Sequence, residues 1–294
     1  MNFLQRMLLK QRDSIAYKHW KFLDKLSRVE LPDVALAPRP EWHFKHSGNA
    51  GDIIYSMPAM LAIAGDAPVH IHLAVDQPAK MPKSFRHPLG NVLLNRKMLE
   101  MLRPLLLSNP QVASVQEWDG RSVDVDLDQF RNIPLMYDRG NIARWYMLIW
   151  GVNWDLNNPW LYADAEPSVS NAIVLARSSR YQAPGIDYSF LRVYPEVVFV
   201  GVQQEYDDMK KMVPNAVYRP SKDFLDLARV IRGSRLFIGN QSFPFSVAEA
   251  LKTRRLLENY FRTPNVIVYG ADGYDFSFQK PFEKLVRQLY AKAD

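Results

Sequence analysis

The sequence contains no cysteine among its 294 residues. Disulfide bonds, thiolate metal sites, iron–sulfur clusters and a cysteine nucleophile are therefore excluded. The sequence also lacks any run of about 18 uncharged apolar residues, so it predicts no membrane-spanning helix. The first twenty residues have neither the continuous apolar region nor the small-residue cleavage site of a signal peptide. We therefore expect a cytoplasmic protein.

Two motifs of common enzyme classes are missing as well. The absence of G-x-x-x-x-G-K-[ST] argues against a P-loop ATPase, and the absence of G-x-S-x-G around Ser56 and Ser242 argues against a serine hydrolase. The excess of one charge sign is small, with 37 Lys+Arg against 31 Asp+Glu and a net charge of +6. This balance suits a protein that handles phosphates, nucleic acid or an acidic membrane surface, and does not choose among them.

Residues 1–30 form a basic segment with apolar residues at helical spacing. Seven Lys or Arg residues stand here against three acidic residues. Two interpretations are open: a solvated helix packed on the body of the protein, or an arm that contacts a membrane surface or a nucleic-acid backbone. Residues 31–40 contain three prolines and predict an extended linker.

From residue 41 onward, predicted strands and helices alternate. This order of apolar strands and helices predicts parallel sheets covered on both faces. A stretch rich in Asn, Pro and Ser at 155–170 marks a boundary, so we expect α/β domains at 41–160 and 161–294 with a cleft between them. The predicted strands are 43–47, 69–75, 112–118, 124–130, 171–177, 195–201, 235–240 and 265–270. The helix predicted after the seventh strand covers 246–260.

The strongest local signal is the segment 47–60, in which a strand ends, a turn with two glycines follows and a helix begins. Backbone N–H groups at such a helix start can bind an anion or an oxygen. Asn49 and Gly51 lie in this turn, and Asp52 lies where open α/β sheets bind their ligands. Asp52 is thus a candidate catalytic carboxylate, and the alternative is a helix N-cap.

Two segments of the second half predict phosphate handling. In 236–251, a buried strand runs through Asn240 into a polar turn, and Ser242 with the following helix start could hold a phosphate. Glu249 lies within that helix and would face either a ribose or solvent. In 177–181, Arg177 and Arg180 bracket two serines and can supply fork-like donors to phosphate oxygens; the alternative is a solvated basic loop.

Taken together, these segments resemble a known family. GNAGDIIYSMPAM (48–60) resembles the N-terminal turn of the ADP-heptose:lipopolysaccharide heptosyltransferase-like glycosyltransferases, with a pattern near G-D-x-x-x-x-x-P-A-L. DFLDLARVIRGSRLFIGNQSFPFSVAEAL (223–251) resembles the family's C-terminal segment, in which a strand leads to a turn like G-N-D-S-G-P-x-H and then to a helix.

The resemblance implies two Rossmann-like domains in the glycosyltransferase B (GT-B) arrangement. It implies that Asp52 is the general base, and that the C-terminal half holds a nucleotide-sugar donor without a metal or another cofactor. The donor-binding residues that we expect are Arg177, Ser178, Arg180, Asn240, Gln241, Ser242, Phe243 and Glu249, and the acceptor-side turn contains Asn49 and Gly51.

Departures from the family pattern leave the substrates open. Gln241 stands where the family usually has Asp, Phe243 where it has Gly and Ser246 where it has His. These positions contact the donor in the family, so heptose and ADP do not carry over. The resemblance implies a surface glycan or a lipopolysaccharide-like or other lipid-linked glycan as the acceptor, and the basic arm and the changed donor turn also permit a modified base in DNA. The basic arm is also a candidate for peripheral contact with the inner membrane face. The alternative function is a non-catalytic module that binds nucleotide sugars or nucleic acid.

Two further patterns predict surface or core residues more strongly than metal ligands. Asp124, Asp126 and Asp128 alternate as in a metal-binding Asp-x-Asp, and a protected strand edge gives the same pattern. Five histidines gather in the first half, but no acidic residue follows them at ligand spacing, which argues against zinc. These histidines are His43, His46, His70, His72 and His87.

Overall fold

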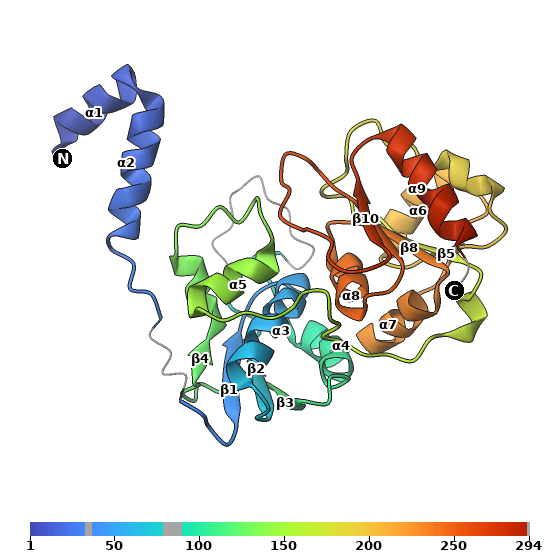
Figure 1. Ribbon diagram of the computed structural model, residues 1–294, viewed down its shortest axis with the longest axis horizontal. Coiled ribbons are helices and arrows are strands. Elements are labelled where there is room, and N and C mark those ends of the chain that lie inside the picture. The colour runs from blue at the N-terminus through green and yellow to red at the C-terminus, as the bar shows by residue number, and fades with distance from the viewer. Residues whose placement is uncertain (33–36, 79–89, 293–294) are drawn as a thin grey trace.

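The computed structural model describes residues 1–32, 37–78 and 90–292 of the chain. The protein is an α/β protein with two parallel sheets, one in each half of the sequence (Figure 1). His87 lies outside the described residues. The two sheets and the helices that flank them confirm the predicted fold class of two Rossmann-like units.

The first sheet has the order β3-β2-β1-β4, and every pair is parallel. Its strands are β1 (Trp42–His46), β2 (Val69–Leu73), β3 (Val112–Glu117) and β4 (Val125–Asp126). The helices of this half are α3 (Ala50–Ala64), α4 (Arg96–Leu106) and α5 (Ile142–Trp150). Buried residues such as Phe44 and Ile71 belong to the core on one face, whereas His43, His70 and Ser114 lie partly exposed on the other. This second face is polar, unlike the apolar face expected of a sheet covered on both sides.

The second sheet has the order β10-β9-β8-β5-β6-β7, again entirely parallel. Its strands are β5 (Ile173–Ala176), β6 (Val197–Phe199), β7 (Val217–Tyr218), β8 (Leu236–Asn240), β9 (Arg255–Glu258) and β10 (Gly273–Phe276). Its helices are α6 (Gln203–Met212), α7 (Phe224–Gly233), α8 (Phe243–Leu251) and α9 (Gln279–Ala291). In both sheets the chain starts in the middle, moves outward on one side and then crosses to the other, as in dinucleotide-binding folds.

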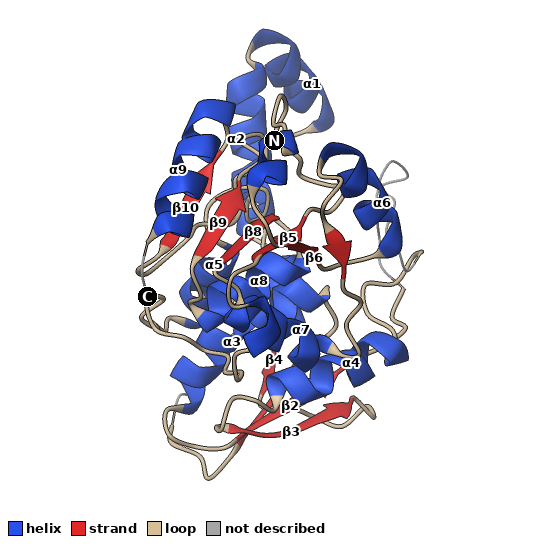
Figure 2. Cartoon of the chain, turned by 90° about the vertical axis from the view of Figure 1, so that its right-hand side faces the viewer, coloured by secondary structure: helices blue, strands red, loops and turns tan. Residues whose placement is uncertain are grey.

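The two halves share a packed boundary. Helix α3 contacts α8, and α4 contacts α7, which places these helices between the two sheets (Figure 2). One apolar cluster extends from Phe44 in the first sheet through Phe245 in α8 to Phe237 in the second sheet. Because α3 is enclosed by β1, β2, α5 and α8, it is buried on nearly all sides, and its sequence is apolar all round.

Pro58 lies inside α3 rather than in its first turns. A proline has no N–H group to donate to the carbonyl four residues earlier, which here belongs to Ile54. The indole Nε1–H of Trp160 donates to that Ile54 oxygen at 3.0 Å, and Trp160 is buried. A side chain from the segment that joins the two halves therefore satisfies the carbonyl that Pro58 leaves open.

Three predicted elements are wrong. Only Val125–Asp126 of the strand predicted at 124–130 is extended, because the Asp126 carboxylate accepts from the N–H of Asp128 and starts a 3-10 helix (Leu127–Asn132). The predicted helix 246–260 ends with α8 at Leu251, where Lys252 adopts a left-handed φ of 55°, and the chain continues as β9. The strand predicted at 265–270 is irregular, and β10 follows it.

The N-terminal arm consists of α1 (Phe3–Arg12) and α2 (Ser14–Leu26), joined at Asp13, whose carboxylate caps α2. Neither helix has a buried residue, and both extend away from the rest of the chain (Figure 1). The arm is thus not packed on the body of the protein. Among the described residues, no helix is long and apolar enough to cross a membrane.

Candidate active site at the two strand switch points

The first half of the site forms where the strand order reverses. The loop after β1 and the 3-10 helix after β4 meet at this point, which is where open α/β sheets bind ligands. The Ser47 N–H donates to Asp128 Oδ1 at 3.0 Å, and Arg131 forms an ion pair with the same carboxylate. Arg131 Nη2 is buried and has no hydrogen-bond partner among the described residues. One nitrogen of the Arg131 guanidinium therefore donates no hydrogen bond to the described residues.

Asp52 lies in the first turn of α3, directly after this loop. Asn49 occupies the N-cap position, so the N-cap interpretation of Asp52 does not hold. Asn49 Nδ2 donates to Asp52 Oδ2 at 3.4 Å. Burial raises the pKa of the Asp52 carboxyl above its usual value, while the positive charges of Arg131 and Arg180 oppose that rise. A carboxylate with a raised pKa is a better proton acceptor than a solvated one.

Charges from both halves of the chain act on Asp52, since Arg131 belongs to the first half and Arg180 to the second. Gly51 makes a related contact: a Cβ atom built there would lie 3.7 Å from Ser246 Oγ of α8. The N-terminal turns of α3 and α8, which carry the two motifs found in the sequence, therefore lie side by side.

A buried histidine supports the loop after β1. The Gly48 N–H donates to His46 Nδ1 at 2.8 Å, so the neutral ring carries its proton on Nε2 and donates it to Tyr146 Oη at 2.9 Å. Burial, together with the nearby Arg131, lowers the pKa of His46 to about 3. His46 is thus a neutral positioning residue for the loop, with no proton to exchange near neutral pH.

The second half of the site forms at the switch point of the other sheet, where the loops after β5 and β8 meet. Asn240 is buried and links these loops, since its Oδ1 accepts from the Ser178 N–H at 2.9 Å and its Nδ2 donates to the carbonyls of Ser178 at 2.9 Å and Arg180 at 2.5 Å. Asn240 therefore fixes the loop of Arg180 by its side chain and is fully engaged within the protein.

A hollow of about 440 Å³ lies next to this loop. It is lined by Ser179, Arg180, Tyr181, Gln182 and Tyr260. The rings of Tyr181 and Tyr260 have their centroids 6.4 Å apart, and Tyr181 has a left-handed φ of 55°. Aromatic faces beside an arginine suit a ligand with a planar ring and a negative charge, such as a nucleotide.

Arg177 does not face this hollow. Its Nε and Nη2 donate to both carboxylate oxygens of the buried Glu258, at 2.7 and 2.8 Å, and its guanidinium lies over the Tyr188 ring. Glu258 also accepts from the Ala183 N–H at 2.7 Å and from Tyr188 Oη at 2.9 Å. The two nitrogens of Arg177 that would grip a phosphate are thus already paired.

The turn before α8 is held mainly by internal hydrogen bonds. Gln241 Nε2 donates to the Thr263 carbonyl at 2.6 Å and to Asn265 Oδ1 at 2.8 Å, and Gln241 Oε1 accepts from the Tyr260 N–H at 2.7 Å. Gln241 therefore positions the loop that carries Tyr260.

The start of α8 has few N–H groups to offer to a phosphate. Ser242 Oγ donates to the Asn240 carbonyl at 3.2 Å, and the N–H of Phe245 is bonded to the Ser242 carbonyl. Pro244 in the first turn has no N–H group. Phe243 packs against Phe224, with ring centroids 4.3 Å apart.

Glu249 lies in the boundary between the halves rather than in solvent. It is 1% exposed, and its carboxylate accepts from Arg255 Nε at 2.6 Å, from Lys252 Nζ at 2.5 Å and from the Tyr269 N–H at 3.1 Å. Its role in ribose binding stays a prediction, but its oxygens are engaged in this network.

Sequence reasoning missed several residues of the site, above all Arg131, Tyr260 and His46. Arg131 follows the strand predicted at 124–130, most of which is not extended. Tyr260 lies in the part of the predicted helix 246–260 that does not form. His46 was counted only as one of several histidines. The reversal of strand order would have pointed to Arg131, since it follows the strand on the other side of β1.

The acidic residues that alternate from Asp124 to Asp128 are paired within the protein. Asp124 accepts from Arg39 and from the His43 N–H, both at 2.8 Å. Asp126 accepts from Lys45 Nζ at 2.9 Å. These carboxylates are thus partly buried and ion-paired, and do not form the solvated strand edge that the pattern also predicted.

Both halves thus present a candidate site at the switch point of a parallel sheet, which defines an α/β protein with two Rossmann-like domains. No protein-family model and no curated protein matches the sequence. Solved glycosyltransferases are similar to the chain in fold over most of its length.

Three of these structures illustrate the similarity. The family 9 glycosyltransferase of Veillonella parvula is 13% identical, with 86% of this chain and 92% of that chain covered and a TM-score of 0.49. The Escherichia coli heptosyltransferase WaaC, solved with ADP-2-deoxy-2-fluoro heptose, is 10% identical, with 84% and 98% covered and a TM-score of 0.48. The dodecameric iron-containing heptosyltransferase TibC, from enterotoxigenic E. coli, is 12% identical, with 81% and 63% covered and a TM-score of 0.49. Each score is below 0.5, so no statement about the substrate of this chain rests on these proteins.

Proposed function

We propose that the protein is a glycosyltransferase that moves a sugar from a nucleotide-sugar donor to an acceptor hydroxyl. The observation that carries the proposal is the position of Asp52. Its carboxyl has a raised pKa, and it lies within the electrostatic reach of Arg180, which lines the hollow of the second half. A proton acceptor from one half and a basic, aromatic hollow from the other are what such a transfer requires.

In the proposed mechanism, Asp52 takes the proton of the acceptor hydroxyl as the hydroxyl oxygen attacks the anomeric carbon of the donor. The bond from that carbon to the diphosphate oxygen breaks, and the diphosphate leaves with the electron pair. Arg180 stabilises the charge that develops on the diphosphate, and Tyr181 and Tyr260 stack against the nucleotide base. Arg131 Nη2 is buried beneath Gly48, so Arg131 acts through its positive charge beside Asp52 and not by a contact to the substrate.

The donor turn departs from the family pattern, and its structure supports an alternative. Gln241 and Ser246 are both committed to internal hydrogen bonds. A non-catalytic module on the same fold would use the hollow beside Arg180 to bind a nucleotide sugar without transfer. Turnover, measured separately from binding, distinguishes these two functions.

The test is a panel of UDP-, ADP-, GDP- and CMP-sugars offered to the full-length protein, with binding followed by thermal shift and turnover by nucleotide release. We expect one nucleotide class to raise the Tm and to be released from its sugar. Asp52→Asn should keep donor binding and lower turnover by about 10²-fold or more, the usual contribution of a general base. Because the pKa of Asp52 is raised, wild-type turnover should increase with pH as this carboxyl loses its proton.

Two matched controls make the test specific. Asp66→Asn removes an exposed carboxylate near the other end of α3 and should leave turnover unchanged. Arg180→Gln should weaken donor binding by about 10-fold, as expected for one charge-assisted hydrogen bond, whereas Arg192→Gln, an exposed arginine of the same half, should not. Asp52→Asn with wild-type turnover contradicts the proposed base, and a donor that binds without any turnover favours the non-catalytic module.

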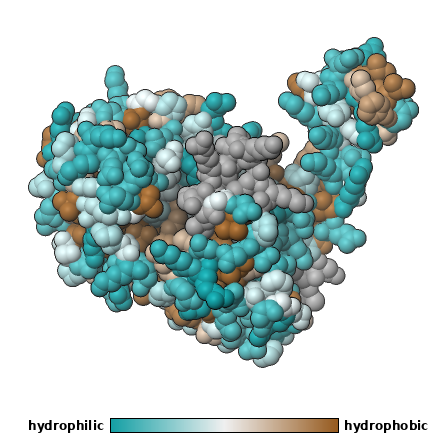
Figure 3. All heavy atoms as spheres, turned by 180° about the vertical axis from the view of Figure 1, so that it is seen from behind, coloured by the Kyte–Doolittle hydropathy of each residue, from teal (hydrophilic) through white to brown (hydrophobic). Residues whose placement is uncertain are grey.

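The surface of the N-terminal arm bears on the choice of acceptor. Phe3, Leu4, Met7 and Leu8 are exposed on α1, and Figure 3 shows apolar side chains gathered at the tip of the arm. Together with the excess of basic residues in 1–30, this composition suits an anionic lipid surface. We therefore propose a lipid-linked or lipopolysaccharide-like glycan as the acceptor, and a peripheral position of the protein on the membrane that carries it. A modified base in DNA is the second candidate, favoured by the same positive charge.

A further inference from the structure

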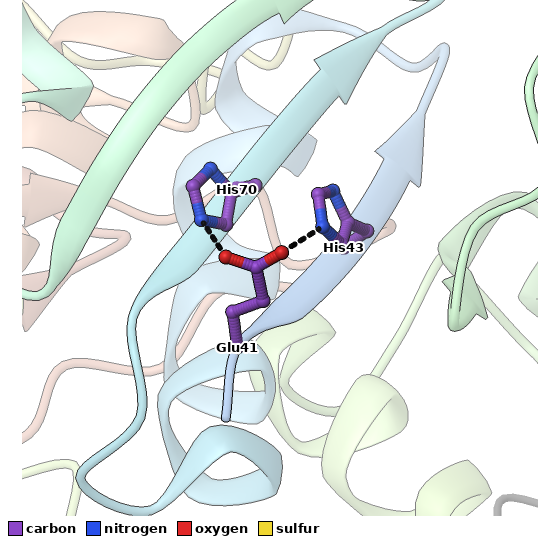
Figure 4. A group of neighbouring side chains, drawn as sticks. All are labelled: Glu41, His43 and His70. Atoms are coloured by element: carbon purple, nitrogen blue, oxygen red, sulfur yellow. Dashed lines mark hydrogen bonds and ion pairs between the residues drawn. The ribbon is translucent and has the colours of Figure 1, made fainter. Parts of the chain in front are cut away.

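The polar face of the first sheet carries a group of side chains that the proposed transfer does not use. Glu41 directly precedes β1, His43 lies in β1, and His70 lies opposite His43 in the neighbouring strand β2. The carboxylate of Glu41 lies between the two imidazole rings (Figure 4). Among the described residues, these three offer one ligand atom each, and all three atoms lie within 4.8 Å of one another.

The distances within this group fit a small metal ion. Glu41 Oε1 lies 3.2 Å from His43 Nε2, and Glu41 Oε2 lies 3.3 Å from His70 Nε2. A tetrahedral zinc ion with bonds of about 2.0–2.1 Å holds its ligand atoms roughly 3.4 Å apart. Two imidazoles and one carboxylate form a donor set that Zn²⁺ and related divalent transition metals bind in proteins, with a further position open to water. Glu41 is about half exposed, so solvent reaches this position.

The second nitrogen of each ring has a partner that would orient it for a metal. His70 Nδ1 lies 2.8 Å from Ser114 Oγ in β3, and His43 Nδ1 lies 2.9 Å from His72 Nε2 in β2. When Nδ1–H donates to such a partner, the lone pair of the neutral ring is on Nε2. With this tautomer both Nε2 lone pairs face the Glu41 carboxylate, which suits a bound cation; without one, each Nε2 carries the proton and donates it to Glu41.

We propose that Glu41, His43 and His70 bind a divalent transition-metal ion, with Ser114 and His72 as positioning residues. The site joins the segment before β1 to β2, at the amino end of the strand whose carboxyl end leads to Asp52. The ion would therefore stabilise the entry of the chain into the first sheet. The site is independent of the proposed glycosyl transfer, so its test does not depend on that activity.

The test uses the full-length protein without a histidine tag, freed of metal by a chelator. Zn²⁺ is titrated calorimetrically, and Co²⁺ is added separately to record the visible absorption of its coordination sphere. We expect one Zn²⁺ per chain, a rise in Tm with Zn²⁺ and a tetrahedral Co²⁺ spectrum. His43→Gln, His70→Gln and Glu41→Gln should each weaken Zn²⁺ binding by at least about 10-fold, and Ser114→Ala by about 10-fold.

His19→Gln is the matched control, since His19 is exposed on α2, away from the sheet, and should bind Zn²⁺ as the wild type does. The three ligand positions are partly or fully exposed, so circular dichroism should show each variant folded. A wild type without saturable binding would overturn the proposal, leaving the group as histidine–carboxylate ion pairs. Binding that survives in both histidine variants would overturn it too, because the ion would then lie elsewhere.

Discussion

At the scale of single residues, the two glycines around the N-terminus of α3 have different surroundings. A Cβ atom on Gly48 would lie 2.5 Å from His46 Cε1 and would also collide with the Arg131 guanidinium, whereas the nearest atoms to a Cβ on Gly51 are 3.7 and 3.9 Å away. Only Gly48 is therefore required by a close approach. Asn49 follows Gly48 directly and donates a hydrogen bond to Asp52, so a backbone shift at Gly48 should displace the proposed base.

We predict that Gly48→Ala lowers the free energy of unfolding by about 1–3 kcal/mol, the usual cost of overpacking, and reduces turnover by displacing Arg131. Gly51→Ala should instead leave stability unchanged or raise it by about 0.5–1 kcal/mol, because alanine is the better residue inside a helix. Urea unfolding of both variants measures the difference. Equal destabilisation by the two substitutions would contradict this account of the turn.

The buried, neutral His46 should make the free energy of unfolding depend on pH. Its pKa is lowered to about 3 in the folded protein, whereas the usual pKa of a histidine is 6.5. The unfolded chain therefore binds more protons between these values, so stability is lost as the pH falls from about 6.5 towards 3.

His46→Gln should reduce the pH dependence of the unfolding free energy between pH 4 and 6.5 by up to about one proton. The exposed His19→Gln should keep the wild-type dependence. Urea midpoints measured across this pH range provide the comparison. Identical slopes for His46→Gln and the wild type would mean that His46 is not held neutral by burial.

At the scale of helices and strands, periodicity predicted the elements that have one exposed face. The strand at 69–75 is predicted by the alternation of polar and apolar residues. The helix that ends before Asn109 has buried residues at helical spacing, from Leu99 to Leu106. β9 was missed because Leu256 and Leu257 lie among charged residues between Lys252 and Glu258, a composition that continues the helical pattern of α8 without a Gly or Pro to mark its end. The break lies at Lys252, whose left-handed φ no sequence pattern announced.

The candidate site was predicted in the same uneven way. Asp52 and Arg180 are predicted because each follows a strand and a turn with a recognisable composition, and their roles stay predictions. Arg177 is predicted to bind the donor because it brackets two serines together with Arg180 in a loop that follows a strand. Its partner Glu258, 81 residues further along the chain, is visible only in the fold. Long-range pairs of this kind separate a structural arginine from a ligand-binding one.

Pro58 and Trp160 give a prediction at the scale of one helix. Trp160→Phe removes the N–H that satisfies the Ile54 carbonyl, so it should cost about 1–3 kcal/mol beyond the small change in volume. Pro58→Ala supplies a backbone N–H to the same carbonyl. The double variant should therefore recover part of the stability lost in Trp160→Phe.

A double-mutant cycle of unfolding free energies measures this coupling, with Trp154→Phe as the control for loss of an indole elsewhere. The indole N–H of Trp154 has no partner among the described residues, so its loss should cost less. Additive effects of Pro58→Ala and Trp160→Phe would show that the indole does not compensate for the proline.

At the scale of the whole molecule, the shared core and the separate arm predict different responses. The contact between α3 and α8 and the apolar cluster around Phe245 join the two halves, so a core substitution in one half should also lower the stability of the other. The arm contributes nothing to this core, since α1 and α2 have no buried residue. Its exposed apolar side chains are stabilised only if another surface covers them.

Removal of residues 1–30 should therefore leave the Tm nearly unchanged while abolishing binding to vesicles that contain an anionic phospholipid. Flotation of the full and shortened chains with anionic and with neutral vesicles measures this, and the binding should fall with added salt because seven basic residues contribute to it. Replacement of Phe3, Leu4 and Leu8 by serine keeps the charge and should weaken binding through the lost apolar area alone. A shortened chain that still floats would contradict a membrane role for the arm, and arm-dependent binding to duplex DNA without vesicle binding would favour the modified base as the acceptor.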